Sequence, residues 1–203
     1  GVPPGTVNLV YGDPAMISSY LIPHPVIRKI SFTGSTSVGK QLAAMAGLHM
    51  KRATMELGGH APVIVFDDAD VDMATKLLVA TKFRNAGQVC ISPTRFLIQE
   101  RVYDQFVEKF TAGAKAVKVG NGMEAGTGMG PLANPRRITA MEGLIADAVQ
   151  KGAKVLLGGQ IPAGVGNYYP ATALSDLTPE MQVYGEEVFG PVALIFRVGD
   201  IGE

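Results

Sequence analysis

Two residues in this chain have the types and the surroundings for covalent chemistry. The single cysteine, Cys90, ends the segment Asn-Ala-Gly-Gln-Val-Cys, and Glu56 opens the segment Glu-Leu-Gly-Gly, 34 residues upstream. A thiolate can attack a carbonyl carbon when a neighbour activates it and donors stabilise the oxyanion. A carboxylate beside an apolar site can exchange a proton near neutral pH. A lone cysteine is more often a small buried hydrophobe, however, and Glu56 alone is compatible with a charge at a strand end.

The residues around Cys90 favour an exposed position for its side chain over a buried one. It follows a helical pattern and precedes Pro93, so we expect it on a turn, where catalytic groups are commonly presented. All histidines precede the cysteine: His24, His49 and His60. This order argues against a papain-like enzyme, which needs a histidine far downstream of its cysteine. We interpret the three histidines as surface or loop residues.

The acidic cluster Asp67, Asp68 and Asp70 is the one run that suggests a cation. It lacks the glycine and the distal glutamate of a calcium loop. Aspartates are favourable cap residues at the N-terminus of a helix. We therefore expect helix capping there, and no metal site.

Four segments in order resemble the aldehyde dehydrogenase superfamily, and succinate-semialdehyde dehydrogenase-like members most of all. They are Phe-Thr-Gly-Ser-Thr-Ser-Val-Gly at 32–39, Glu-Leu-Gly-Gly at 56–59, Asn-Ala-Gly-Gln-Val-Cys at 85–90 and Glu-Glu-Val-Phe-Gly-Pro at 186–191. Each segment alone is weak evidence, whereas four in the family's order are strong. The resemblance covers essentially all 203 residues. Family chains are more than twice as long, so we expect an internal fragment of a longer protein.

The resemblance implies a two-stage oxidation that uses NAD or NADP. Cys90 would add to an aldehyde carbonyl to give a thiohemiacetal, hydride would pass to the nicotinamide ring, and a thioester would remain. Glu56 would be the general base that activates water to hydrolyse this thioester. The backbone N–H of Cys90 and an asparagine from a segment outside this chain would hold the oxyanion.

The same resemblance assigns five residues to the cofactor. Gly34 and Ser35 would approach the pyrophosphate, Leu57 the carboxamide, Glu187 the nicotinamide ribose and Phe189 the ring. From the residues alone, Gly34 and Ser35 lie between a predicted strand and a predicted helix, where free N–H groups can bind phosphate. A plain strand-to-helix turn fits that spacing equally well, and Phe189 also fits a core position.

Arg84 is the candidate determinant of the substrate. It stands six residues before Cys90, where succinate-semialdehyde dehydrogenases are similar in holding an arginine for the substrate carboxylate. A guanidinium grips a carboxylate through two parallel hydrogen bonds. The resemblance thus implies a small semialdehyde acid, while an exposed helix arginine is the alternative. His60 departs from the family pattern, since many members have lysine after Glu-Leu-Gly-Gly.

Two other interpretations remain open. The chain could be a catalytically silent fragment without cofactor binding, or Cys90 and Glu56 could serve an esterase or thioesterase. We expect the 203-residue chain by itself to be inactive as a dehydrogenase, because it lacks part of the cofactor cleft and one oxyanion donor.

The composition is that of an ordinary globular protein. Hydrophobic residues make up 47% and charged residues 18%, with 18 basic and 18 acidic side chains. With no net charge and no large basic cluster, we expect no nucleic-acid partner. Apolar runs are far shorter than the ~20 residues needed to span a bilayer, so we expect no membrane partner. One cysteine fits a reducing, cytoplasmic location, and the family resemblance implies a homo-oligomer, a dimer or tetramer.

The elements that position these residues alternate along the chain as in an α/β fold with a doubly wound parallel sheet. The pattern predicts helices over 14–22, from 36 onwards, and over 71–85, 102–117 and 136–151. It predicts strands over 6–11, 28–32, 54–57, 62–66, 95–99, 154–157, 168–174 and 192–197. Two glycines after Leu57 mark a boundary. We expect residues 1–58 to form the second half of a Rossmann-like dinucleotide-binding domain, and 59–203 most of an α/β catalytic domain that is incomplete at its C-terminus.

Overall fold

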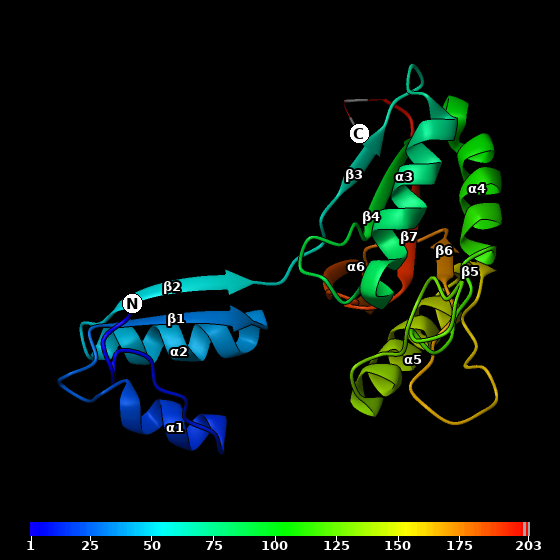
Figure 1. Cartoon of the computed structure of the whole chain (residues 1–203). Coiled ribbons are helices and arrows are strands. Elements are labelled where there is room, and N and C mark those ends of the chain that lie inside the picture. The colour runs from blue at the N-terminus through cyan, green and yellow to red at the C-terminus, as the bar shows by residue number, and fades with distance from the viewer. Residues whose placement is uncertain (201, 203) are drawn as a thin grey trace. The chain divides into compact units, whose positions relative to one another are not determined.

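The chain folds into two compact units, residues 1–58 and 59–203, each shown in the computed structural model in Figure 1. The structure describes residues 1–200 and 202. Among them, no helix combines the length and the apolar character needed to cross a membrane. The division falls between Gly58 and Gly59, in the glycine pair that follows the second strand.

The first unit is a two-stranded parallel sheet with two helices. Its elements in chain order are α1 (Pro14–Leu21), β1 (Lys29–Gly34), α2 (Thr36–Leu48) and β2 (Arg52–Leu57). Both helices begin with a local signal. The Asp13 side chain accepts from the Met16 N–H at 2.7 Å, and the Ser35 hydroxyl accepts from the Val38 N–H at 3.4 Å.

One predicted element of this unit is wrong. Residues 6–11 form no strand, although apolar and polar residues alternate there. All six are exposed, and the preceding backbone closes a turn in which the Thr6 N–H donates to the Pro3 carbonyl at 3.3 Å. Alternation favours a strand only where a neighbouring strand accepts its hydrogen bonds, and this segment pairs with none of the described strands.

The second unit is built around a five-stranded sheet in the order β3-β4-β7-β6-β5. The strands are β3 (Val63–Val65), β4 (Arg95–Gln99), β5 (Lys154–Leu157), β6 (Thr172–Ser175) and β7 (Val192–Val198). The helices are α3 (Val71–Phe83), α4 (Glu100–Lys115), α5 (Pro135–Gln150) and the short α6 (Gln182–Gly185). Neighbouring strands are parallel except for β5, which runs antiparallel to β6 at the edge. The α/β prediction holds, but the sheet is mixed.

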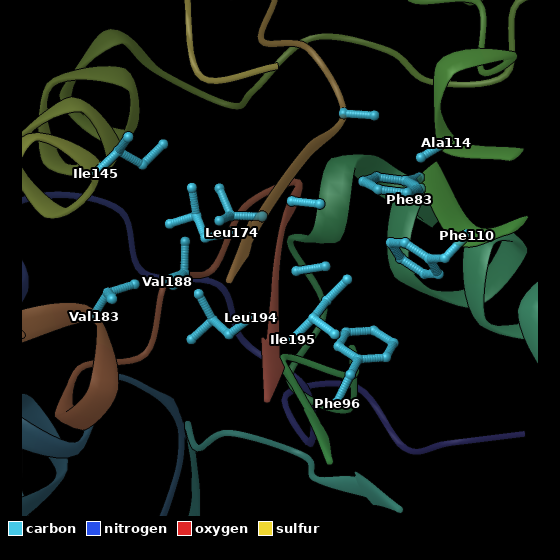
Figure 2. Close-up of a cluster of buried hydrophobic side chains, with 14 of the residues drawn as sticks. Phe83, Phe96, Phe110, Ala114, Ile145, Leu174, Val183, Val188, Leu194 and Ile195 are labelled. Atoms are coloured by element: carbon cyan, nitrogen blue, oxygen red, sulfur yellow. The ribbon is translucent and has the colours of Figure 1, made fainter. Parts of the chain in front are cut away.

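The core explains why β7 occupies the centre. Its residues Val192–Ile195 are fully buried, as expected for a strand covered on both faces. In Figure 2, the strand residues Leu174 and Leu194 lie between Ile145 of α5 and the rings of Phe83 and Phe110 from α3 and α4. Burial of these aliphatic and aromatic side chains holds the helices on the sheet.

Candidate active site

The turn that carries Cys90 begins where α3 ends. Arg84–Gly87 form a 3₁₀ turn in which three successive residues have positive φ: Asn85 (50°), Ala86 (53°) and Gly87 (69°). Left-handed backbone is costly for residues other than glycine and asparagine. The run therefore stops the helix two residues before the predicted end at residue 85, and turns the chain sharply.

Side chains hold the turn in this shape. The Asn85 amide donates to the Gln88 carbonyl at 3.1 Å, and the Gln88 N–H donates back to the Asn85 carbonyl at 3.1 Å. The Gln88 side chain accepts from the Ala133 N–H at 2.9 Å. Asparagine and glutamine in the signature therefore fix the backbone before the cysteine.

Gly87 brings two of the sequence signatures together. A Cβ added to Gly87 would stand 2.1 Å from the carbonyl oxygen of Gly190. Only glycine can lie so close to that backbone. The segment that ends at Cys90 thus packs directly on the Glu-Glu-Val-Phe-Gly-Pro segment, although the two are far apart in sequence.

Cys90 itself is an exposed free thiol. It lies inside a turn closed by the Ser92 N–H, which donates to the Val89 carbonyl at 2.9 Å. Within the part of the chain that the structure describes, the backbone N–H of Cys90 donates to no acceptor. The residue therefore offers an accessible sulfur and a free N–H donor, and it lies on a turn as the sequence predicted.

The segment around Glu187 has a constrained backbone. Phe189 has a φ of 45° between the buried residues Val188 and Gly190. A bulky residue with positive φ is rare and marks a position that the surroundings impose. Glu187 and Phe189 are both half-buried, so neither is a plain core residue.

Arg84, the predicted substrate residue, is exposed at the C-terminal end of α3. Its φ of −56° and ψ of 131° are extended, so it ends the helix. Among residues 1–200 and 202, its guanidinium pairs with no carboxylate. Arg84 begins the 3₁₀ turn that precedes the Val89–Ser92 turn containing Cys90.

Two charged residues near this turn escaped the sequence prediction. Burial lowers the pKa of Lys82 from 10.5 to about 7, against the opposing charge of Glu187. Burial also lowers the pKa of Arg137 on α5, and the carboxylates of Glu187 and Glu186 oppose that effect. Lys82 was detectable, because it follows Leu78 at helical spacing on the inward face of α3. Arg137 gave no such signal.

His60 lies in the loop between β2 and β3, where it is half-buried. Burial lowers its pKa, and the positive charges of Arg95 and Lys82 lower it further. The imidazole is therefore neutral near pH 7.

In the first unit, the predicted cofactor and base residues gather at the carboxyl ends of two parallel strands. Gly34 is the register partner of Leu57, and Thr33 is the partner of Glu56. Ligands in open α/β sheets bind at this edge. Ser35 follows directly as the N-cap of α2, whose first turn carries no acidic residue. The helix N-terminus is thus left positive for an anion.

A cavity of about 1030 Å³ lies within the first unit between α1, β1 and α2. Most of the side chains that these elements contribute are apolar, namely Ile17, Leu21, Ile22, Ile30, Phe32, Val38, Leu42 and Met45. An apolar slot next to a helix N-terminus suits a ligand with a flat ring and a phosphate. The sequence gave no indication of this cavity, because its walls come from three elements.

Two of the three aspartates of the acidic cluster have structural partners. Asp70 caps α3 by accepting from the Met73 N–H at 3.0 Å, and Asp67 pairs with Arg101 at 3.3 Å. Among the described residues, no three histidine, cysteine, aspartate or glutamate side chains gather as a metal site would require.

Comparison with known proteins agrees with this geometry. Residues 1–203 match the model of the aldehyde dehydrogenase family. The chain is 45% identical to a 3-sulfolactaldehyde dehydrogenase of Pseudomonas putida, over 97% of this chain and 40% of that protein. It is 42% identical to an NADP-dependent succinate-semialdehyde dehydrogenase of Escherichia coli, over 98% of this chain and 42% of that protein.

Solved structures show the same relationship. The crystal structure of succinate-semialdehyde dehydrogenase from Burkholderia pseudomallei superposes with a TM-score of 0.94 at 45% identity, covering 98% of this chain and 42% of that one. The chain thus spans about two fifths of the length of the relatives it matches. The fold prediction is confirmed, and the chain belongs to the aldehyde dehydrogenase family.

Proposed function

We propose that the protein containing this chain oxidises an aldehyde to a carboxylic acid with NAD or NADP, through a covalent intermediate on Cys90. The observation that carries the proposal is the close approach of Gly87 to the Gly190 carbonyl, which places the nucleophile's turn against the segment of Glu187 and Phe189. Reduction of added cofactor by the whole protein, followed by absorbance with a panel of aldehydes, tests it.

The residues of the first unit fit a dinucleotide. Gly34, Ser35 and the positive end of α2 would hold its pyrophosphate, and the apolar cavity would take its adenine ring. Leu57 would meet the carboxamide, while Glu187 and Phe189 of the second unit would meet the nicotinamide ribose and ring. When bound, NAD or NADP supplies the acceptor for hydride from the substrate carbon.

The residues of this chain would divide the remaining work. The Cys90 thiolate adds to the aldehyde carbon, and the free N–H of Cys90 stabilises the oxyanion. Loss of hydride from that carbon would leave a thioester between the acyl group and the sulfur. Glu56 takes a proton from water, whose oxygen attacks the thioester carbon, and the acid leaves as the thiolate is restored.

The substrate we propose is a small aldehyde that also carries an anionic group, with succinate semialdehyde as the first candidate. Arg84 supports this class, because its exposed guanidinium has no carboxylate partner among the described residues. One relative is named for a carboxylated aldehyde and another for a sulfonated one. A guanidinium can bind either anion through paired hydrogen bonds.

Replacing Arg84 with alanine should lower kcat/KM for succinate semialdehyde. The loss of transition-state stabilisation should be about 1.5–3 kcal/mol, the contribution of hydrogen bonds to a charged group. An uncharged aldehyde of similar length should lose little, and a sulfonated aldehyde should lose as much as the carboxylated one. Arg101→Ala is the matched control, since that arginine pairs with Asp67 on the surface. Equal losses on charged and uncharged substrates would show that Arg84 supports the turn and not recognition.

Replacing Glu56 with glutamine should slow release of the acid more than formation of the thioester. Glutamine keeps the shape of the side chain but cannot accept a proton from water. Rapid mixing with excess aldehyde should then give a burst of about one reduced cofactor per site, followed by a slow steady state. Loss of the burst in a folded variant would point to thiol activation, and an unchanged steady state would remove Glu56 from the mechanism.

The same assays separate the two alternative functions. A cysteine-dependent esterase would cleave an activated ester without NAD or NADP, and a silent protein would do neither reaction. We also propose a cytoplasmic location and a homo-oligomer, a dimer or tetramer. The single cysteine supports the first through its fit to a reducing compartment, and family membership supports the second.

A further inference from the structure

Lys82 is buried in a way that packing does not explain. It is 1% exposed, and among residues 1–200 and 202 it is the only buried lysine, arginine, histidine, aspartate or glutamate. Lysine is almost never fully buried unless a partner compensates its charge. It stands on the inward face of α3 after Val71, Thr75 and Leu78, where an apolar residue would fit.

Lys82 contacts the Val89–Ser92 turn, which contains Cys90. Its Nζ donates to the Ser92 hydroxyl at 3.4 Å, and the same hydroxyl lies 3.4 Å from the Lys82 carbonyl oxygen, to which it donates. Ser92 is 5% exposed, and its N–H closes the turn by donating to the Val89 carbonyl at 2.9 Å. Both the side chain and the backbone of Lys82 are therefore tied to the residue that ends this turn.

The electrostatic surroundings of Lys82 include the Glu-Glu-Val-Phe-Gly-Pro segment at 186–191. The Glu187 carboxylate raises the pKa of Lys82 and that of Arg137 from α5, against the effect of burial. The positive charges of Arg95 and Lys82 lower the pKa of His60, which precedes β3. The segment of Glu187 packs on the segment of Cys90, since a Cβ added to Gly87 would stand 2.1 Å from the Gly190 carbonyl oxygen.

We propose that Lys82 is a positioning residue, which holds the Val89–Ser92 turn and the Glu187 carboxylate in a fixed mutual arrangement. The inference rests on the function proposed above, because it assigns to Lys82 the alignment of the nucleophile with a cofactor-binding carboxylate. Replacing a buried charge with an apolar side chain of similar volume is often neutral or stabilising. A lysine at this position is therefore better explained by a role in the site than by packing.

Lys82→Met is the test, because methionine keeps the unbranched length and removes the charge and the donors. We expect kcat/KM for both cofactor and aldehyde to fall by about 10-fold or more, without a fall in Tm. Ser92→Ala should act in the same direction with a smaller loss. Lys76→Met is the matched control, since Lys76 is exposed on the same helix and should leave activity and Tm unchanged.

Stability as a function of pH tests the burial of the Lys82 charge. The pKa of Lys82 falls from 10.5 to about 7 on folding, chiefly through burial. Between these values the unfolded chain binds more protons than the folded one, so the stability of the parent protein should rise with pH. Lys82→Met should have a higher Tm than the parent, and this difference in Tm should be largest at about pH 6 and smaller at about pH 9.

Hydrogen exchange tests the positioning whether or not the protein oxidises aldehydes. In Lys82→Met, the Ser92 N–H should exchange about 10-fold faster, while β4 and β7 keep the parent's protection. Unchanged exchange at the turn would overturn the proposal, as would parental kcat/KM in an active enzyme. Faster exchange throughout the unit would reduce Lys82 to a structural role. Failure of the parent protein to oxidise any aldehyde would instead overturn the proposed function.

Discussion

Replacing Cys90 with alanine in the whole protein should abolish aldehyde oxidation, with kcat lowered by at least about 10⁴-fold. Every covalent intermediate of the proposed reaction is attached to this sulfur, so its removal leaves no route to the thioester. Cys90→Ser should be nearly as inactive, because a hydroxyl without an activating base is a poor nucleophile. Initial rates of cofactor reduction with excess aldehyde measure the effect.

The exposed thiol provides a control for folding. Neither substitution removes a buried contact, so both variants should keep the parent's Tm and its affinity for cofactor by calorimetry. Iodoacetamide should inactivate the parent protein by alkylating Cys90. A variant without Cys90 that retains near-normal kcat would exclude covalent catalysis at this position.

Replacing Gly87 with alanine should destabilise the second unit by about 1–3 kcal/mol and remove most of the activity. The added Cβ would stand 2.1 Å from the Gly190 carbonyl oxygen, and a φ of 69° is unfavourable for alanine. The turn must therefore move away from the Glu187 segment. Thermal unfolding and kcat at a temperature where the variant is folded would measure the two effects.

Gly122→Ala is the matched control for Gly87→Ala. Gly122 lies in the same unit, and a Cβ there would meet no atom within 4 Å. That variant should retain the stability and activity of the parent. Gly87→Ala with an unchanged Tm and unchanged kcat would show that the two signatures do not depend on this close approach.

Elements with local signals were predictable from the sequence. β4 has its predicted bounds of residues 95–99, and α1 begins at Pro14 after a capping aspartate, because alternation, caps and proline act within a few residues. The strand predicted at 6–11 failed because pairing depends on distant neighbours. The antiparallel direction of β5 was missed for the same reason.

In the candidate site, too, the features that depend on neighbouring residues were predictable and those that depend on distant residues were not. The sequence placed Cys90 on an exposed turn, since glycine, proline and the end of a helical pattern are local features. It did not show that Gly87 meets Gly190, or that Glu187 attracts Lys82, because those contacts join segments separated by most of the second unit. The apolar cavity of the first unit was missed because three elements must pack before its walls exist.

The left-handed run at Asn85, Ala86 and Gly87 gives part of the Asn-Ala-Gly-Gln-Val-Cys signature a purely structural explanation. Gly87 is required there by its positive φ and by the lack of room for a Cβ beside the Gly190 carbonyl, independently of any reaction. We expect a relative that had lost its thiol to keep this glycine in order to fold its turn. Backbone geometry therefore explains Gly87, whereas only the proposed reaction explains Cys90.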